Sequence, residues 1–140
     1  MSGSTQKTIF VVDDSDAILM NVSETLDDTY RVITMSSAKR MYALLEKIIP
    51  DMILLDIEMP EIKGTDAIVT LKSTPAWKDI PVMFLTGWGG EDFVIQFCLE
   101  QGALDVMHKP FSPALLKKRV ENLIKLIDFA KIIEKISGKS

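Results

Sequence analysis

The sequence predicts an α/β fold of the doubly wound kind, in which helices cover both faces of a parallel sheet. Four short segments along the chain are apolar throughout rather than alternating, which is typical of strands buried on both faces, and a weaker fifth candidate follows them. Segments with helical spacing separate them, so that strand and helix alternate five times and the crossovers are right-handed. A length of 140 residues fits one such domain.

The apolar runs give the positions of the expected strands along the chain. Four runs stand out, and a weaker fifth precedes the last helical segment. By residue number, the five expected strands are 9–12, 32–33, 52–55, 82–85 and 104–107.

The first four helices are predicted from apolar residues that repeat every three or four positions. The first three repeats are Ile18, Val22 and Leu26, then Ala38, Tyr42 and Leu45, then Ala67, Ile68 and Leu71. The fourth helix is expected from about 91 to 101, with an apolar side made of Phe93, Val94, Phe97 and Cys98. Ser15 or Asp16 can cap the first helix, and Gly102 can end the fourth.

The last helix is expected to be unusually long. It begins near Ser112 and Pro113 and can continue to about Ile136, roughly 36 Å at 1.5 Å per residue. A four-three heptad spacing followed by two further apolar positions is formed by Leu116, Val120, Leu123, Ile127, Ala130, Ile133 and Ile136. The helix end either docks on its own domain or forms a coiled coil or linker that leads to a partner or another domain.

Composition excludes several classes of function. The charge sum is 16 basic against 20 acidic residues, a net charge of −4, which argues against nucleic-acid binding by this domain. One cysteine, Cys98, and one histidine exclude a disulfide framework and a zinc or copper centre of soft ligands. A bound metal is therefore expected to be a hard cation held by oxygen.

No targeting or membrane-spanning segment is visible in the sequence. The first seven residues are polar, and we expect 1–7 to be disordered or added in cloning. The longest apolar runs have four residues, far short of the roughly 20 that span a bilayer. We therefore expect a cytoplasmic protein without a membrane partner.

Three carboxylates follow two of the expected strands. Asp13 and Asp14 come directly after the first strand, and Asp56 comes directly after the third. Parallel strands share one carboxyl edge, where ligands bind at the switch point of the winding. Two such charges about 4 Å apart repel by roughly 4 kcal/mol at an effective dielectric of 20, a cost that Mg²⁺ relieves. One such acid alone would more often cap the next helix, whereas three acids at two strand ends favour a shared site.

Two further residues are expected at the same edge. Thr86 follows the fourth strand, and Lys109 follows the fifth. A metal, a hydroxyl and an ammonium around one carboxylate suit a phosphoryl group, because the cations neutralise its oxygen charge. Asp56 is then the natural nucleophile, since carboxylates form aspartyl-phosphates.

These residues together resemble the receiver domain of bacterial two-component response regulators. The resemblance rests on Asp13-Asp14, Asp56-Ile57-Glu58-Met59-Pro60 with Gly64, Thr86-Gly87 and Lys109-Pro110-Phe111. It covers roughly residues 8–126 and implies a flavodoxin-like (βα)5 three-layer sandwich with strand order 2-1-3-4-5. We therefore expect a receiver domain over 8–126 and an extension of the last helix, or linker tail, over 127–140.

The resemblance also implies the roles of the acidic residues. Asp56 would take a phosphoryl group from the phosphohistidine of a sensor histidine kinase or a phosphotransfer protein, with Mg²⁺ required. Asp14, Asp56 and the backbone carbonyl of Glu58 would contact the metal, and Asp13 would act mainly through water.

The same resemblance assigns the residues around the phosphoryl group. Thr86 and Lys109 would hold its oxygens, and Gly87 would leave room for them. The Lys109–Pro110 bond is cis in this family. His108 is expected to point away from the site, because neighbouring residues of a strand alternate faces.

The sequence departs from the family at the position three residues before the lysine. An aromatic residue is usual there and swings inward on activation, whereas this chain has Val106. Switching is therefore expected to use the loop Gly87-Trp88-Gly89-Gly90, whose three glycines give it backbone freedom. We hypothesise that Trp88 and Glu58 flank the phosphoryl group and control water access, although Trp88 is equally readable as a loop anchor.

Two other functions stay open on the sequence alone. One is a pseudo-receiver that binds partners without modification, and the other is an aspartyl-phosphate hydrolase of the haloacid dehalogenase type, which fits less well because Ile18 replaces its threonine or valine. We expect no enzyme activity beyond self-phosphorylation and autodephosphorylation. A homodimer through the fourth helix, fifth strand and fifth helix is compatible with the long last helix.

Overall fold

The protein contains a parallel sheet between two layers of helices. The computed structural model describes residues 6–87 and 92–138. Within these residues five strands pair in the order β2-β1-β3-β4-β5, and all four pairings are parallel. The strand bounds are Thr8–Val12 (β1), Arg31–Met35 (β2), Met52–Asp56 (β3), Val82–Thr86 (β4) and Asp105–His108 (β5). The predicted fold and strand order are therefore confirmed.

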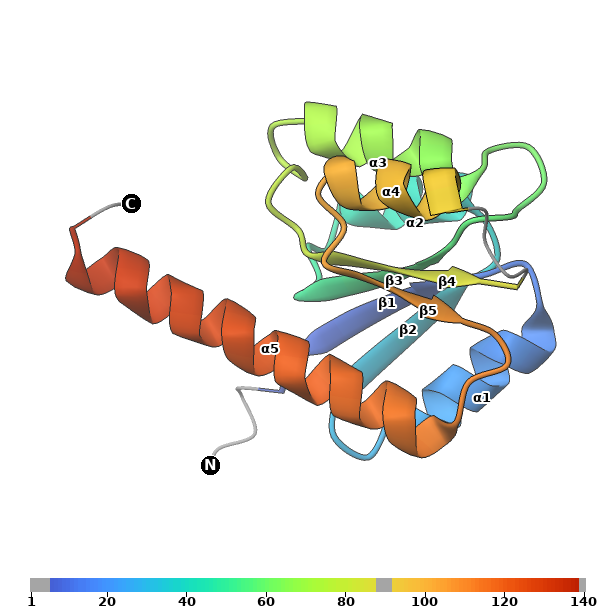
Figure 1. Ribbon diagram of the computed structural model, residues 1–140, viewed down its shortest axis with the longest axis horizontal. Helices are drawn as coiled ribbons and strands as arrows, with labels where there is room; N and C mark the ends of the chain where they lie inside the picture. Colours follow the sequence, from blue (N-terminus) through green and yellow to red (C-terminus); the bar gives the residue numbers. More distant parts are fainter. Residues whose placement is uncertain (1–5, 88–91, 139–140) are drawn as a thin grey trace.

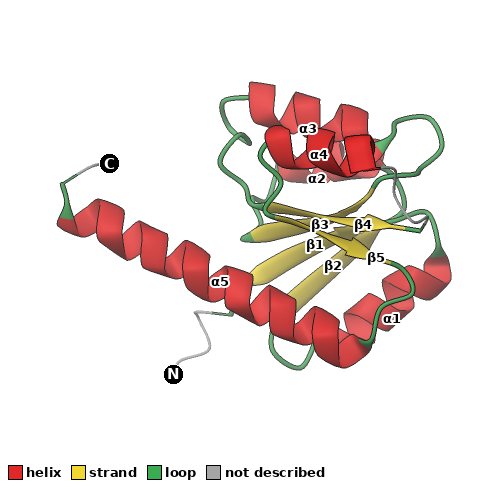
Figure 2. Ribbon diagram, viewed as in Figure 1, coloured by secondary structure: helices red, strands yellow, loops and turns green. Residues whose placement is uncertain are grey.

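The helices divide between the two faces of this sheet (Figure 1). Helices α1 and α5 cover one face, and α2, α3 and α4 cover the other (Figure 2). The helix bounds are Asp16–Leu26 (α1), Ala38–Leu45 (α2), Gly64–Ser73 (α3), Asp92–Glu100 (α4) and Pro113–Ile136 (α5). This arrangement confirms the three-layer sandwich.

Alternating side chains of the central strands supply two separate cores. Phe10, Ile53 and Phe84 face α2, α3 and α4, whereas Met52 and Leu54 face α1 and α5. All are fully buried. Because both faces are covered, these strands are apolar at successive positions instead of every second one.

Serine side chains fix the starts of three helices. Ser15 accepts a hydrogen bond from the Ile18 backbone N–H at 3.3 Å, so Ser15, not Asp16, caps α1. Ser37 and Ser112 cap α2 and α5 in the same way. Gly102 has a φ of +102° just after α4, a left-handed conformation that glycine adopts at low cost where a helix ends.

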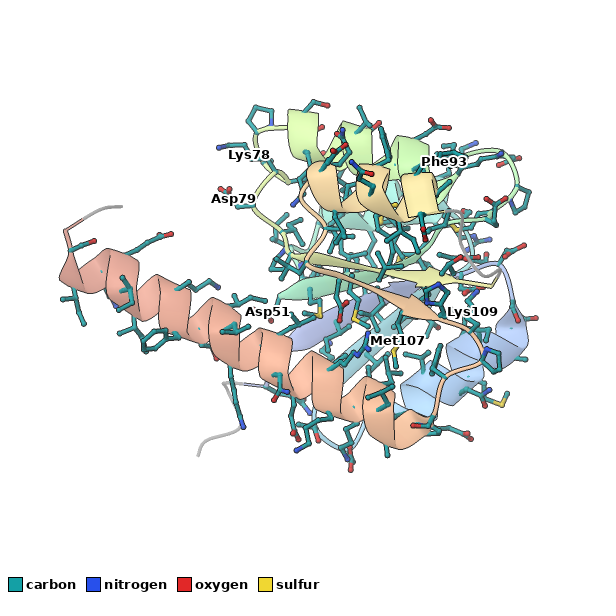
Figure 3. The ribbon with its side chains drawn as sticks, in the orientation of Figure 1. Asp51, Lys78, Asp79, Phe93, Met107 and Lys109 are labelled. Carbon is teal, nitrogen blue, oxygen red and sulfur yellow. The ribbon has the colours of Figure 1, made fainter. Side chains whose placement is uncertain are left out.

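Two residues predicted on the apolar side of the fourth helix are exposed: Phe93 is 70% exposed (Figure 3) and Phe97 is 36% exposed. Cys98 carries the buried side of α4 instead. The fifth strand begins at Asp105 rather than Leu104, which is 45% exposed, because β5 is an edge strand with one open side.

Helix α5 differs between its two halves. In the first half Leu116, Val120 and Ile124 are buried against the sheet. In the second half Ile133 and Ile136 are exposed, and the helix extends past the strand ends (Figure 1). The predicted heptad therefore packs on the domain only in its first part. Among the described helices, none is both long and apolar enough to span a membrane.

Candidate functional site

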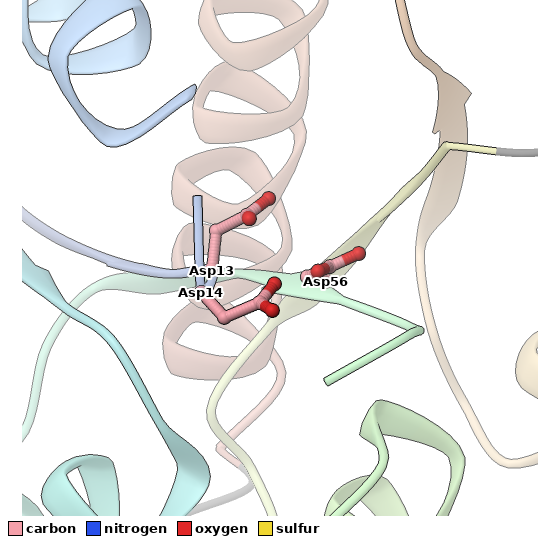
Figure 4. A group of neighbouring side chains, drawn as sticks. All are labelled: Asp13, Asp14 and Asp56. Carbon is pink, nitrogen blue, oxygen red and sulfur yellow. The ribbon is translucent and has the colours of Figure 1, made fainter. Parts of the chain in front are cut away.

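Three aspartates converge at the carboxyl ends of β1 and β3 (Figure 4). One carboxylate oxygen from each of Asp13, Asp14 and Asp56 lies within 4.8 Å of the others. Asp13 is fully buried and Asp56 is 2% exposed, whereas Asp14 is exposed. The strand order explains this cluster, because β1 and β3 are neighbours and their last residues share one edge.

Lys109 joins the cluster from the end of β5 (Figure 3). Its Nζ lies 2.6 Å from Oδ2 of Asp13 and 3.2 Å from Oδ1 of Asp56. The Lys109–Pro110 peptide bond is cis, as the resemblance implies. His108, one residue earlier, is exposed. The ion pair between Lys109 and Asp13 was not anticipated, because nothing in the sequence couples residues 96 positions apart.

Backbone N–H groups fix the two buried carboxylates. The Ser15 N–H donates to Oδ1 of Asp13 at 2.9 Å, and the Glu58 N–H donates to Oδ1 of Asp56 at 3.3 Å. Asp13 does not cap α1, because Ser15 is the N-cap, but its side chain orders the turn that leads into the helix. Its other oxygen nevertheless pairs with Lys109 inside the site.

The pKa values of Asp56 and Lys109 are shifted by burial and by the neighbouring charges of the cluster. Burial, with the nearby charge of Asp13, raises the pKa of Asp56 to about 6, against the lowering effect of Lys109. Burial by itself would lower the pKa of Lys109, but the hydrogen bond and charge of Asp13 outweigh it and raise that pKa. The lysine is therefore firmly protonated, while Asp56 ionises at some cost.

Gly64 explains how the loop after β3 closes against the site. A Cβ at Gly64 would overlap the carbonyl oxygen of Asp56 and lie 2.9 Å from Cα of Ile57. The Gly64 N–H donates to the Ile57 carbonyl at 2.8 Å. Only glycine permits α3 to start this close to the phosphoacceptor candidate. The sequence motif contains Gly64, but this reason for it is visible only in three dimensions.

Thr86 and Gly87 lie at the end of β4 beside Lys109. Thr86 is 3% exposed, and its carbonyl accepts a hydrogen bond from the Lys109 N–H at 2.7 Å. Among the described residues, a Cβ at Gly87 would meet the Lys109 side chain at 4.0 Å, an ordinary van der Waals contact. Val106 is half-buried in the core on the α4 side of the sheet. Trp88 lies outside the described residues.

The donor set suits a hard divalent cation. Three carboxylates and one ammonium carry a formal charge of −2 when all are ionised. Oxygens 4.8 Å apart or closer repel by about 3 kcal/mol per pair at an effective dielectric of 20. Carboxylate oxygens are also the ligands that Mg²⁺ prefers. The charge and the chemistry of these residues therefore fit a magnesium ion.

Comparison with known proteins identifies the family. A family model described as the response regulator receiver domain matches residues 9–121. That match covers most of the chain, and the chain belongs to this family of signalling domains.

Curated relatives agree with this assignment. A probable cyclic di-GMP phosphodiesterase of Vibrio cholerae is 40% identical over 121 residues, which make up 86% of this chain and 27% of that protein. The phosphate regulon transcriptional regulatory protein PhoB of Pseudomonas aeruginosa is 35% identical over 120 residues, or 85% of this chain and 52% of PhoB. This chain thus spans between about a quarter and a half of the length of these relatives.

Solved structures show the same fold. The BeF3-activated receiver domain of DrrB is 29% identical with a TM-score of 0.77, covering 86% of this chain and 99% of that one. The chemotaxis response regulator CheY4 of Vibrio cholerae is 29% identical with a TM-score of 0.78, covering 84% and 98%.

These comparisons establish the general function. The chain is a phosphoacceptor signalling domain of a two-component system, and neither the pseudo-receiver nor the hydrolase alternative is favoured. Receiver domains bind Mg²⁺ at an acidic pocket and interact with histidine kinases or phosphotransfer proteins. They generally act as signalling modules rather than as enzymes.

Proposed function

We propose that Asp56 is the phosphoacceptor of this receiver domain. The observation that carries the proposal is the convergence of three carboxylates and the Lys109 ammonium at the carboxyl ends of β1, β3 and β5. Of the three acids, Asp56 is the one held by both a backbone N–H and the lysine on the same oxygen, Oδ1.

The transfer is a substitution at phosphorus. A carboxylate oxygen of Asp56 forms a new P–O bond while the P–N bond to the donor histidine breaks, and the electron pair returns to the imidazole. Asp14, Asp56 and the backbone carbonyl of Glu58 would hold Mg²⁺, and Asp13 would act mainly through water. When bound, the ion supplies positive charge for the phosphoryl oxygens.

Lys109 and Thr86 would hold the oxygens of the transferred group. Lys109 is protonated and already lies 3.2 Å from Asp56, so its charge meets the incoming phosphoryl group without a large movement. Thr86 would donate a hydrogen bond from its hydroxyl. Gly87, which has no side chain, would leave room for the group.

Intact-mass measurement tests this assignment. Incubation with Mg²⁺ and a small-molecule phosphodonor is expected to add one phosphoryl group to the wild-type chain. Asp56→Asn and chelation of the metal should each abolish the addition. Asp66→Asn changes an exposed aspartate of α3 in the same way and should leave the addition intact.

Other outcomes of this experiment would overturn the proposal. Release of many phosphates per chain would indicate a hydrolase, and absence of any reaction would indicate a pseudo-receiver. Phosphorylation that persists in Asp56→Asn would place the acceptor on another residue.

The lifetime of the phosphorylated state is proposed to depend on Trp88 and Glu58. Glu58 is exposed directly beside the Asp56 carboxylate, and Trp88 follows the last residue of β4 by two positions in the sequence. With Val106 in place of an aromatic residue, switching would rely on the glycine-rich segment Gly87-Trp88-Gly89-Gly90. An unchanged dephosphorylation rate in Trp88→Ala would refute the role of Trp88.

The phosphodonor is proposed to be a sensor histidine kinase or a phosphotransfer protein. Residues 8–126 would form the receiver domain, and 127–140 an extension of the last helix or linker tail. A homodimer through α4, β5 and α5 stays a prediction, which light scattering before and after phosphorylation would test.

A further inference from the structure

The second half of α5 carries an apolar surface that the domain does not cover. We call it the α5 stripe. Its five side chains are between 48% and 78% exposed, and they are Leu126, Phe129, Ile132, Ile133 and Ile136. Exposed apolar side chains occur singly on most proteins, but a contiguous group of five marks an interaction surface.

The stripe lies on the side of α5 opposite to the one that packs on the sheet. At 3.6 residues per turn, it is rotated by about 180° from Leu116, Val120 and Ile124. Beyond Ile127 the side that continues the buried face is charged, with exposed Lys131 and Lys135. In the extension, the apolar and charged sides of α5 are therefore exchanged relative to the first half. The extension is not a simple continuation of the helix side that packs on the core.

An ion pair marks where the helix leaves the domain. Nζ of Lys7, just before β1, lies 2.8 Å from Oδ1 of Asp128. Past this contact α5 runs on as regular helix to Ile136, clear of the sheet in Figure 1. The stripe thus lies on a helix that the Lys7–Asp128 pair ties to the domain, and its apolar side chains face solvent.

The spacing of the apolar residues in the stripe suits helix–helix packing against the same stripe of a second copy. Leu126, Phe129, Ile133 and Ile136 are separated by three, four and three residues, the a and d positions of a heptad. Ile132 widens the seam on one side. The charged residues of the extension, Asp128, Lys131, Glu134 and Lys135, lie off this seam by helical rotation. Exposed Lys125 borders the stripe where it begins, one turn before Phe129, and from Leu126 to Ile136 no charged side chain lies within the seam.

The exposed apolar side chains of α4 fit a second copy less well. Phe93 and Leu99 are exposed there, but Asp92 and Glu100 lie at the two ends of the same short helix. A symmetric contact between two α4 helices would bring like acidic charges together. The α5 stripe has a charged neighbour, Lys125, at one end only, so an antiparallel two-fold contact keeps the two lysines apart.

We propose that the α5 stripe is a two-fold interface between two copies of this chain. Its five side chains offer on the order of 500 Å² per copy, or 1,000 Å² in a pair, at the lower limit for a specific interface. The dimer is accordingly expected to dissociate with a constant in the micromolar range. The proposal does not depend on phosphorylation of Asp56.

Sedimentation velocity of the whole 140-residue chain, unphosphorylated and with a metal chelator, tests the proposal. From low to high micromolar concentration, the wild-type chain should shift from monomer to dimer. Phe129→Lys and Ile133→Lys should each raise the dissociation constant of the dimer about tenfold or more, because each places a charge in the seam. Both side chains are exposed, so circular dichroism should show unchanged folding.

Two controls make the result specific. Lys131→Glu reverses a charge on the opposite side of the same turn, and Phe93→Lys adds a charge on α4; both should keep the dimer. Asp56→Asn should also keep it, which separates this inference from the phosphoacceptor assignment. A wild-type chain that stays monomeric, or a dimer that is lost in Phe93→Lys but kept in Phe129→Lys, would overturn the proposal.

Discussion

The carboxylate cluster and the α5 stripe are both energetically unfavourable in the isolated domain, but for opposite reasons. In the cluster, Asp13 and Asp56 are buried charges with one lysine between them. In the stripe, apolar side chains such as Phe129 and Ile136 are exposed to water. Each arrangement costs free energy in the isolated chain, the first through desolvation and repulsion, the second through unburied apolar surface.

The difference shows what each region is suited to bind. Repulsion between buried carboxylates is relieved by a small hard cation that their oxygens can bind. An extended apolar surface is relieved only by another surface of similar shape. The two regions lie toward opposite ends of the strands, since the cluster follows β1 and β3 whereas Asp128 contacts Lys7 before β1. Each can therefore be altered without touching the other.

The largest effect is expected from removing the lysine of the cluster. Lys109→Met should lower the free energy of unfolding of the metal-free protein by about 3 kcal/mol at pH 8, because two buried carboxylates lose their counter-charge. Urea unfolding with a chelator measures this. Lys118→Met breaks the exposed pair with Glu121 and should change little. Equal effects of the two substitutions would show that the cluster is not electrostatically strained.

A second prediction compares the two halves of α5. Leu116→Ala should cost about 2–4 kcal/mol, since Leu116 is fully buried, whereas Leu126→Ala should cost less than about 0.5 kcal/mol in the monomer. Denaturant unfolding at a concentration where the chain is monomeric gives both values. A large cost for Leu126→Ala would mean that the extension docks on its own domain.

A third prediction concerns pH in the absence of metal. The pKa of folded Asp56 is raised to about 6, so between pH 4 and 6 the folded chain binds more protons than the unfolded chain. The unfolding free energy should therefore fall as pH rises through this window, by on the order of 1–3 kcal/mol. Asp56→Asn should remove this fall, whereas Asp66→Asn should retain it. Urea titrations at pH 4, 6 and 8 with a chelator compare the three proteins.

The smallest effect is expected at the base of the extension. Asp128→Asn removes an ion pair whose side chains are 30% and 43% exposed, and should cost less than about 0.5 kcal/mol. Thermal unfolding of the two chains at low and high salt measures it. If Asp128→Asn lowered the unfolding free energy as much as Lys109→Met, the exposed lysine–aspartate pair would stabilise the fold as strongly as the buried one, contrary to this prediction.

The sequence predicted the fold and the place of the site, but not the contacts within it. The predicted strands agree with the structure to within three residues at each end, and α5 spans Pro113–Ile136 as expected. By contrast, the ion pair of Lys109 with Asp13 and the close approach at Gly64 escaped prediction. Both join atoms from separate elements, and their distances depend on how the loops close.

By itself, the sequence determined that strand and helix alternate, and that Asp13, Asp14 and Asp56 directly follow two of the apolar strands. These features are local, because unbroken apolar runs and helical periodicity are properties of a few adjacent residues. Only the tertiary structure decided which apolar residues are covered. Leu116 and Leu126 are the same residue type on one helix, and Leu116 is buried while Leu126 is exposed because the sheet packs against only one side and ends before the helix does.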